Sequence, residues 1–572
     1  MAHSTDQQSD VYDVAIMGGG AAGLTLALEL SQARPDTSIV VIERRRHPVP
    51  EAAHKVGEST VEIAAHYLRE VLGLGDHLER HQLDKFGVRV FFSDDSNEDI
   101  ARRVEIGHPV PPPHSVGSYQ LDRGRLENAL GQELHRLGIP FLSGRRVQEI
   151  DLRPDQDRHR LTLVADGGGE HQVAARWVVD ATGRSSTLKR QLGLAKKVGH
   201  RANAVWFRIG HPIDIDAWST DPGWNGRIRA GRRELSTNHL MGPGYWVWLI
   251  RLASGAISIG IVTDADTHPF SGMNRFERAL DWLREHEPQC AREVERHRDK
   301  LQDFRVMKDY SYSCERVMSD ERWCLTGEAG VFLDPLYSPG LDLIAIGNGL
   351  VTDLVTRALD GEDIRERAAV HDRTYLTAVE DWLENFEKQY VLMGNARIMM
   401  AKIIWDVSRY WGGPGLLYFH GMFRRLADFP QIVTGLARRT EINRQVQRFF
   451  REWHALDQSS ETDTFVRYSD FDFMRRLHIG MSAGLPDQEL QARFAANVRF
   501  LEQLSGQLVS TVIAECEARR DDEAVRRQVE LWEGDAALMG LVRIYREESR
   551  ENPVSDRWIT LKRPERVQQP VG

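Results

Sequence analysis

A glycine-rich turn near the start of the sequence has the spacing that binds the phosphates of a dinucleotide. Gly18, Gly20 and Gly23 form the pattern Gly-x-Gly-x-x-Gly, with Ala21 and Ala22 between the last two. The first glycine permits a tight turn, the second lets the backbone approach a pyrophosphate, and the third lets a helix pack closely on a strand. The N-terminus of that helix would present free N–H groups to the phosphates. The turn therefore predicts a dinucleotide site.

The elements around this turn predict its place at the edge of a parallel sheet. Residues 12–17 are an apolar run that predicts a buried strand, residues 24–30 predict a helix, and residues 38–42 predict a second strand. Glu43 follows that second strand, 20 residues after Gly23, the spacing at which a carboxylate accepts hydrogen bonds from the adenosine ribose. This βαβ order favours a ligand-binding turn over a glycine-rich turn without a ligand.

Two later glycine turns favour FAD over NAD. Asp180 and Gly183 follow one short apolar run, and Gly327 and Glu328 follow another. A simple NAD-dependent dehydrogenase does not need these turns. The three turns together resemble the FAD-binding set of aromatic hydroxylases and flavin-dependent halogenases, in which the last turn meets the ribityl chain and pyrophosphate. Glu328 stands where that superfamily usually has the shorter aspartate. The resemblance implies FAD as the cofactor.

Further segments resemble the flavin-dependent halogenases in particular. Residues 55–60 are similar to a strap beside the flavin in that family, and residues 334–340 are similar to a loop that lies by the isoalloxazine and holds chloride with backbone groups. With an arginine that is similar to one near the flavin, these segments imply the following contacts to FAD: Lys55, Ser59, Arg123, Asp334, Pro339, Gly340 and Leu341. The same loop implies contacts to a halide ion from Ser338 and Gly340.

The resemblance also separates the flavin from the substrate. Trp246, Trp248 and Ile250 resemble the halogenase signature WxWxIP, whose tryptophans would form a wall between flavin and substrate. Lys85 falls about where these halogenases carry their catalytic lysine. In such a role its amine would capture hypohalous acid made at the flavin and aim it at one carbon of the substrate. Lysine suits this role because a desolvated amine has a lowered pKa.

The residue types also permit plainer interpretations. Trp246 and Trp248 alternate along a strand and could simply fill one core face. Lys85 lies in a charged segment and could be a solvated lysine at a strand end. Ser59 could hold a turn only, and Arg123 could form a surface ion pair.

Two residues depart from the halogenase pattern. Arg251 stands where the signature has proline, and Asp342 would repel an anion if its side chain pointed toward the expected halide position. Without halide, the same scaffold would act as a FAD-dependent monooxygenase on a bulky or carrier-bound substrate. A non-catalytic FAD-binding scaffold is a third reading, which Lys85 and both tryptophans disfavour.

Composition excludes several other classes of protein. The 572 residues are 41% hydrophobic and 28% charged, as in ordinary globular proteins, and the net charge of −10 comes without a basic block that would bind nucleic acid. No apolar run approaches the roughly 20 residues of a membrane-spanning helix, and the polar start predicts no secretory signal. The four scattered cysteines favour a reducing cytoplasm and offer no metal-ligand spacing.

The expected fold is α/β, with a Rossmann-like FAD-binding domain, a β-sheet substrate domain and a mainly helical C-terminal region. We expect a disordered N-terminus over 1–10 and a FAD-binding, monooxygenase-like module over 11–360, with a strand-rich insertion at about 200–265. Long helical patterns predict a helical region over 361–552, and 553–572 is expected to be an extended tail.

These inferences predict a halogenase-like oxidoreductase that uses FADH2, O2 and halide to halogenate an electron-rich aromatic or pyrrole-type small molecule in secondary metabolism. Only one dinucleotide fingerprint is present, which favours a separate flavin reductase as the source of reduced FAD. The helical region is compatible with a dimer. The alternative remains a flavin monooxygenase that does not use halide.

Overall fold

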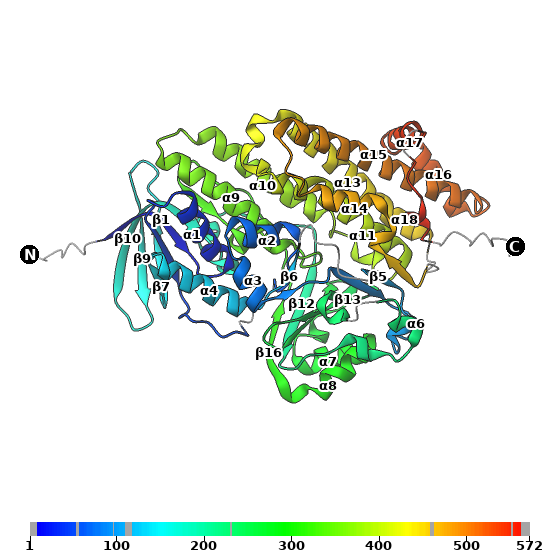
Figure 1. Cartoon of the computed structure of the whole chain (residues 1–572), viewed down its shortest axis with the longest axis horizontal. Helices are drawn as coiled ribbons and strands as arrows, with labels where there is room; N and C mark the ends of the chain where they lie inside the picture. Colours follow the sequence, from blue (N-terminus) through cyan, green and yellow to red (C-terminus); the bar gives the residue numbers. More distant parts are fainter. Residues whose placement is uncertain are drawn as a thin grey trace, which may run out of the picture.

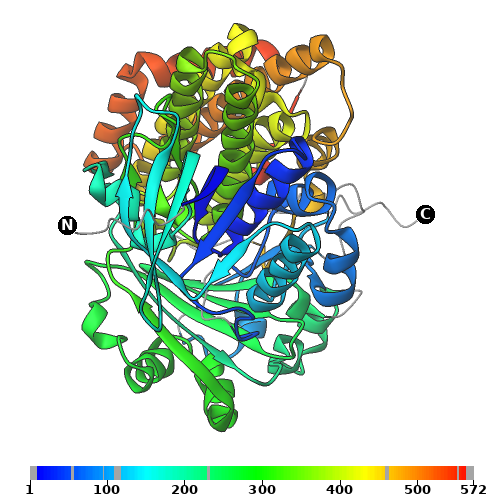
Figure 2. The ribbon, with the colours of Figure 1, turned by 90° about the vertical axis from the view of Figure 1, so that its left-hand side faces the viewer.

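Two large β-sheets and a layer of helices form most of the molecule (Figure 1). The computed structural model describes residues 9–52, 57–94, 96–108, 117–228, 232–457, 463–550 and 553–561. In Figure 1 the first sheet lies at the left, the second sheet lies below, and the helices from α9 (Pro339–Leu359) onward cover the upper side. Figure 2 shows the blue and cyan strands of the first sheet between the helical layer above and the second sheet below.

The first sheet has seven strands in the order β7-β2-β1-β10-β9-β8, with β18 paired to β10. Its parallel strands are β1 (Asp10–Met17), β2 (Ile39–Glu43), β7 (Phe141–Ser143), β10 (Glu170–Asp180) and β18 (Trp323–Leu325). Its antiparallel extension consists of β8 (Arg145–Asp151) and β9 (His159–Ala165). Val14, Ile16 and Val41 are fully buried, as expected for parallel strands with both faces covered.

Helices cover this sheet. The longer ones are α1 (Ala21–Ala33), α4 (Arg123–Arg136) and α9 (Pro339–Leu359), and both α4 and α9 pack against α1. The shorter ones are α2 (Glu62–His66), α3 (Gly75–His81) and α5 (Thr187–Gln191). The predicted Rossmann-like α/β fold is confirmed.

The second sheet has eight strands in the order β16-β12-β15-β14-β13-β4-β5-β19. The strands are β4 (Val88–Phe92), β5 (Glu105–Gly107), β12 (Ala202–Ile209), β13 (Thr237–Gly242), β14 (Tyr245–Arg251), β15 (Ile257–Asp264), β16 (Leu301–Met307) and β19 (Phe465–Arg467). Two small sheets pair β3 (Leu83–Asp84) with β6 (Tyr119–Gln120), and β11 (Ala195–Lys196) with β17 (Ser313–Cys314). The second sheet therefore draws strands from well outside residues 200–265.

Alternation along β14 gives the second sheet two different faces. Val247 and Leu249 pack in a cluster with Leu283, beneath the helices α6 (Pro222–Asn225), α7 (Phe276–His286) and α8 (Pro288–Arg296). Trp246 and Trp248 point to the opposite face and join the core shared with the first sheet and the C-terminal helices. The period of two along the strand thus directs both tryptophans toward the FAD-binding domain.

The C-terminal region is mainly helical. Its helices are α10 (Arg365–Leu383), α11 (Ala396–Tyr410), α12 (Leu416–Phe419), α13 (Pro430–Leu456), α14 (Asp472–Gly480), α15 (Asp487–Glu517), α16 (Glu523–Gly534), α17 (Ala536–Glu548) and α18 (Arg557–Thr560). Trp405, Phe449 and Trp532 are buried in the same continuous core that holds the first sheet. This region also supplies β19, which pairs with β5 of the second sheet.

One expectation for this region was wrong. Residues 557–560, read from the sequence as part of an extended tail, form the short helix α18, which packs on α11. Trp558 and Ile559 are fully buried, and the Trp558 indole donates a hydrogen bond of 2.8 Å to Gln507. Two apolar side chains in a polar stretch give little periodic signal, yet they are enough to anchor the segment.

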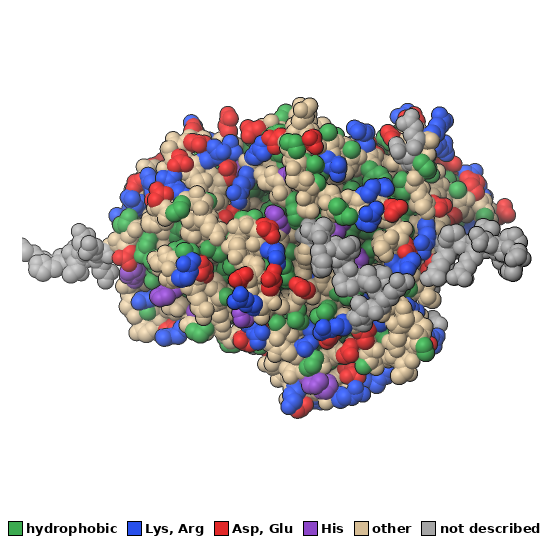
Figure 3. All heavy atoms as spheres, viewed as in Figure 1, with side chains coloured by type: hydrophobic (Ala, Val, Ile, Leu, Met, Phe, Trp, Pro, Cys, Tyr) green, Lys and Arg blue, Asp and Glu red, His purple; other side chains and the backbone are tan. Residues whose placement is uncertain are grey.

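The surface is charged and mixed. On the face shown in Figure 3, Lys and Arg side chains alternate with Asp and Glu and leave no broad area of one sign. Among the helices described, none combines the length and apolar character needed to cross a membrane.

Candidate active site

A cavity of about 590 Å³ lies where the parallel strands of the first sheet end, facing β14 of the second sheet. We call it the flavin cavity. Ligands of doubly wound sheets bind at this edge. The predicted site residues that line it are Gly20, Ala21, Ala22, Glu43, Ser59, Arg123, Gly183, Trp246, Trp248, Gly327, Glu328, Asp334, Ser338, Pro339, Gly340 and Leu341. Segments far apart in the sequence therefore converge on one site.

Gly18 and Gly23 shape the turn without lining the cavity. Gly18 has φ +116°, and a Cβ there would lie 2.2 Å from the carbonyl oxygen of Ala181. A Cβ on Gly23 would lie 1.9 Å from the carbonyl oxygen of Gly18. Only glycine allows β1, β10 and α1 to approach so closely. Both residues thus hold the turn that presents Gly20.

Asp180 also lies outside the lining, which differs from its predicted contact with FAD. It is fully buried, and its Oδ1 accepts hydrogen bonds from the Thr182 backbone at 2.9 Å and hydroxyl at 2.6 Å. Its Oδ2 accepts from the Leu188 backbone at 2.7 Å. Because both oxygens are engaged, Asp180 shapes the turn that carries Gly183. The predicted flavin contact Lys55 lies outside the described residues.

The flavin cavity has a donor set that fits FAD. Gly20 is the N-cap residue of helix α1, and because it has no side chain, the first N–H groups of the helix have no side-chain cap. Such N–H groups bind phosphate. Arg44, Arg45 and Arg184 add positive charge to the lining. Glu43 lies at the end of β2, and its Oε2 accepts a hydrogen bond of 2.6 Å from the Gly19 backbone.

Trp246 and Trp248 form one wall of the flavin cavity. Their ring centroids are 5.7 Å apart, and both side chains are buried. The Trp246 indole donates to the Tyr390 hydroxyl at 2.9 Å, and the Trp248 indole donates to Ser258 Oγ at 3.2 Å. These two hydrogen bonds fix both rings against the cavity.

Asp334 connects this wall to the C-terminal helices. Its Oδ2 bonds with His200 Nε2 at 2.7 Å and accepts from the hydroxyls of Tyr310 at 2.8 Å and Tyr390 at 2.7 Å. Burial by itself would raise the pKa of Asp334, but the bonds with His200 and Tyr390 outweigh it and hold that pKa below its usual value. The carboxylate therefore organises the wall through Tyr390, which also receives the Trp246 bond.

A second cavity of about 310 Å³ lies between Lys85, the start of α9 and the helices α10, α11 and α13. We call it the substrate cavity. Lys85 lines it and is only 6% exposed, so it is not a solvated lysine. Its Nζ donates to Ser59 Oγ at 2.9 Å and to the Thr60 carbonyl at 2.8 Å. Burial lowers the pKa of Lys85 to about 8.

The hydrogen bond between Lys85 and Ser59 spans the wall between the two cavities. Ser59 lines the flavin cavity, whereas Lys85 lines the substrate cavity. Ser59 is itself held by Thr237 at 2.9 Å between the two hydroxyl oxygens. The Lys85 amine in the substrate cavity is thus hydrogen-bonded to a hydroxyl that lines the flavin cavity.

Asp342 points away from the flavin cavity. It lies in the first turn of α9 and lines the substrate cavity, where its carboxyl accepts from the Ala64 backbone at 2.9 Å and the Tyr410 hydroxyl at 2.7 Å. Burial raises its pKa to about 8, so the carboxyl is largely neutral at pH 7. The anion repulsion considered from the sequence therefore has no basis at the flavin cavity. Arg251 lines neither cavity and forms an ion pair with Glu234 at 3.4 Å.

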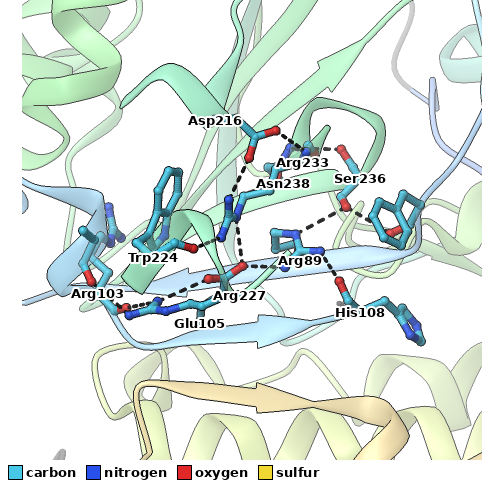
Figure 4. Close-up of polar contacts among 12 residues, drawn as sticks. Arg89, Arg103, Glu105, His108, Asp216, Trp224, Arg227, Arg233, Ser236 and Asn238 are labelled. Atoms are coloured by element: carbon cyan, nitrogen blue, oxygen red, sulfur yellow. Dashed lines mark hydrogen bonds and ion pairs between the residues drawn. The ribbon is translucent and has the colours of Figure 1, made fainter. Parts of the chain in front are cut away.

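A buried arginine network anchors the strand that follows Lys85 (Figure 4). Arg89, Arg227 and Arg233 surround the carboxylate of Glu105. Arg89 and Glu105 are both fully buried. The guanidinium groups come from distant segments, so the network joins β4 and β5 to the loop before β13.

The network holds the chain close to Lys85 itself. Ser236 lies between Arg89 and the Phe86 carbonyl, accepting from the first at 3.4 Å and donating to the second at 3.0 Å. The Lys85 backbone N–H is held by the Ser118 carbonyl at 2.8 Å. Sequence reasoning missed this network because residues so far apart carry no spacing signal.

Other residues of the site come from the helical region and were also missed. Tyr390, Asp381 and Arg439 lie between residues 361 and 552, where the helical patterns do not show which polar side chains point inward. One signal exists for Arg439: it stands seven residues after Ile432 and seven before Val446, on the buried face of α13. An arginine on an apolar stripe indicates a buried polar function.

The chain is similar to proteins of known function. A family model described as a FAD binding domain matches residues 11–225. A flavin-dependent halogenase of Dictyostelium discoideum, chlA, is 26% identical over 70% of this chain and 69% of its own length. A 1H-pyrrole-2-carbonyl-[peptidyl-carrier protein] brominase of Pseudoalteromonas luteoviolacea is 27% identical over 62% of this chain and 79% of its own.

The chain is a relative of the flavin-dependent halogenases. The crystal structure of halogenase PltM in complex with phloroglucinol and FAD has the same fold, with a TM-score of 0.64, 17% identity, and coverage of 85% of this chain and 96% of the other. This halogenase relative binds FAD and is an oxidoreductase. The predicted resemblance to flavin-dependent halogenases, the prediction of FAD binding and the prediction of an oxidoreductase are confirmed.

Proposed function

We propose that this halogenase relative uses reduced FAD, O2 and a halide ion to halogenate an electron-rich aromatic or pyrrole-type small molecule. The observation that carries the proposal is the Lys85–Ser59 hydrogen bond, because it places a buried amine next to both cavities. Direct transfer of oxygen from flavin to substrate would not need an amine between them. Trp246 and Trp248 line the flavin cavity but not the substrate cavity, which supports their separating role.

When bound, reduced FAD would supply two electrons and two protons, so that O2, halide and one further proton give hypohalous acid and water. Lys85 then holds the hypohalous acid. An ammonium group has three donors, and Ser59 and Thr60 engage two of them, which leaves one for a ligand. Transfer of halogen to a ring carbon forms the carbon–halogen bond, the ring loses a proton, and the hydroxyl leaves as water. Because Lys85 is buried, little water competes for this contact, which strengthens it.

We place the halide at the start of α9, where Ser338 and Gly340 line the flavin cavity. Ser338 precedes the helix with φ +58° and does not cap it with its side chain, so backbone N–H groups remain for an anion. Asp342 engages its carboxyl elsewhere and does not oppose this site. The monooxygenase alternative depended on repulsion of the halide by Asp342, and this position of Asp342 removes that argument.

Reduced FAD would come from a separate flavin reductase. Residues 11–360 would bind FAD and halide, and the helical region 361–552 would close the substrate cavity, because α10, α11 and α13 line it. The cysteines Cys290, Cys314, Cys324 and Cys516 are free and buried, which is compatible with a reducing cytoplasm. A role in secondary metabolism follows from the substrate type.

The test supplies the purified protein with reduced FAD, O2 and sodium bromide and measures the masses of products from a panel of phenols, pyrroles and indoles. We expect a product in which bromine replaces hydrogen, visible from its isotope pattern. Lys85→Ala should abolish this product while FAD binding persists. The control Lys196→Ala removes an exposed lysine on β11 and should keep the activity.

Two results would contradict the proposal. A product that is heavier by one oxygen and independent of bromide would establish a monooxygenase. Bromination by Lys85→Ala at the rate of the parent protein would remove Lys85 from the mechanism, whatever the product.

A further inference from the structure

The helical wall of the substrate cavity contains an ionic cluster that the proposed halogenation does not use. Asp381 on α10 accepts hydrogen bonds of 2.5 Å from Arg409 Nη1 on α11 and of 2.5 Å from Arg439 Nη2 on α13. These three side chains line the cavity and are 4%, 2% and 5% exposed. The same cavity is lined by Lys85.

The cluster is short of one negative charge. Arg409 and Arg439 share the single carboxylate of Asp381, and the adjacent pair of Lys402 and Asp406 at 2.5 Å adds no net charge. Burial lowers the pKa of Arg439 to about 10, and the positive charge of Arg409 lowers it as well. Asp381 raises this pKa but only partly offsets the two effects. A buried charge without a counterion is costly, so a ligand with one negative charge would stabilise this wall.

Several donors in the cluster are unused. The Nε and Nη1 atoms of Arg439 and the Nε of Arg409 are buried and have no hydrogen-bond partner in the described part of the chain, and these three unused donors outnumber the one unused acceptor, Asp381 Oδ1. A buried unsatisfied donor costs about 1–3 kcal/mol, so such groups call for an unseen partner. Acceptor atoms of a bound molecule would supply it.

The rest of the lining suits a flat apolar group. Trp382, Phe423, Leu426 and Leu436 line the cavity beside the arginine cluster. Val433 lines it as well and is 46% exposed, so the cavity is accessible from the α13 side. The substrate cavity therefore combines an apolar interior, an excess of positive charge and the amine of Lys85.

Building on the proposed function, we infer that the substrate is a small aromatic acid whose carboxylate binds at Arg439 while its ring lies in the part of the cavity lined by Lys85. Charge-assisted hydrogen bonds from the guanidinium would fix one end of the molecule. Fixing that end sets which ring carbon faces the oxidant, so Arg439 would determine the position of halogenation.

The experiment measures binding by calorimetry in the absence of turnover, with 4-hydroxybenzoate and its neutral analogue 4-hydroxybenzamide as probes. We expect the parent protein to bind the acid about ten- to a hundredfold more tightly than the amide, the range that hydrogen bonds to a charged group supply. Arg439→Gln should abolish this preference. The control Arg438→Gln, whose partly exposed side chain pairs with Glu502 at 2.7 Å, should keep it.

Equal affinities for the two probes, or no saturable binding of the acid, would overturn the inference and leave water as the partner of the cluster. The comparison in the parent protein decides this even if Arg439→Gln does not fold. A preference that survives in folded Arg439→Gln would also overturn it. Lys85→Ala separates the two proposals, because it should keep the preference for the acid although it does not halogenate.

Discussion

Substitution of Lys85 by methionine tests whether this amine is held in a dry site. The structure places the Lys85 ammonium in a buried position that lowers its pKa from 10.5 to about 8. At about 1.36 kcal/mol per pKa unit, this difference corresponds to about 3 kcal/mol of folding free energy. The cost arises because the charged form loses its hydration on folding.

The direction of the change in stability with pH follows from the protonation of Lys85 in the folded and the unfolded state. Below pH 8 both states carry the charge, so the folded protein bears the full cost. Between about pH 8 and 10.5 the folded state has released the proton while the unfolded state still holds it, so stability rises with pH. Lys85→Met removes this titration, and the parent protein should therefore gain about 3 kcal/mol relative to the variant between pH 8 and 10.5.

The assay is urea unfolding followed by tryptophan fluorescence, for both proteins, at a series of pH values from 7 to 10.5. The difference in unfolding free energy between the two is the quantity of interest, because other titrating groups and the lost contacts of Lys85 cancel from its pH dependence. Lys196→Met, which removes an exposed lysine, should show a constant difference from the parent. A constant difference for Lys85→Met as well would refute the reasoning.

Two further predictions concern the frame of the site. Glu105→Gln should destabilise the fold by about 3–5 kcal/mol in urea unfolding, because it leaves the buried guanidinium groups of Arg89 and Arg233 without their shared counterion. The control Glu133→Gln, which removes one charge of an exposed ion pair with Arg136, should cost less than about 1 kcal/mol. Gly20→Val should yield colourless protein, because a branched side chain at the start of α1 would block the approach of the FAD pyrophosphate; a yellow flavin spectrum in the purified variant would contradict the cofactor site.

The charged groups of the substrate cavity share one property, which is that burial opposes their charged forms. Lys85 and Asp342 have pKa values of about 8 for this reason, although one is lowered and the other raised. Both are therefore close to their titration points at physiological pH. Such tuning is typical of catalytic sites and costs stability that a purely structural core would not lose.

The sequence by itself determined the cofactor and the family resemblance. The turn from Gly18 to Gly23, the carboxylate of Glu43 and the later turns at Gly183 and Gly327 are local patterns, because each follows a strand and its spacing is set by backbone geometry alone. A short segment carries all the information for such a turn. The Rossmann-like fold could be predicted on the same ground.

Only the tertiary structure decided which side chains face which cavity. Lys85 and Ser59 are 26 residues apart and Arg439 lies on a distant helix, so no spacing shows that Ser59 lines the flavin cavity while Lys85 and Arg439 line the substrate cavity. Asp342 shows the same limit, since only packing against Ala64 and Tyr410 directs its carboxyl away from the flavin cavity. Burial and charge depend on neighbours from the whole chain, and these neighbours exist only once it has folded.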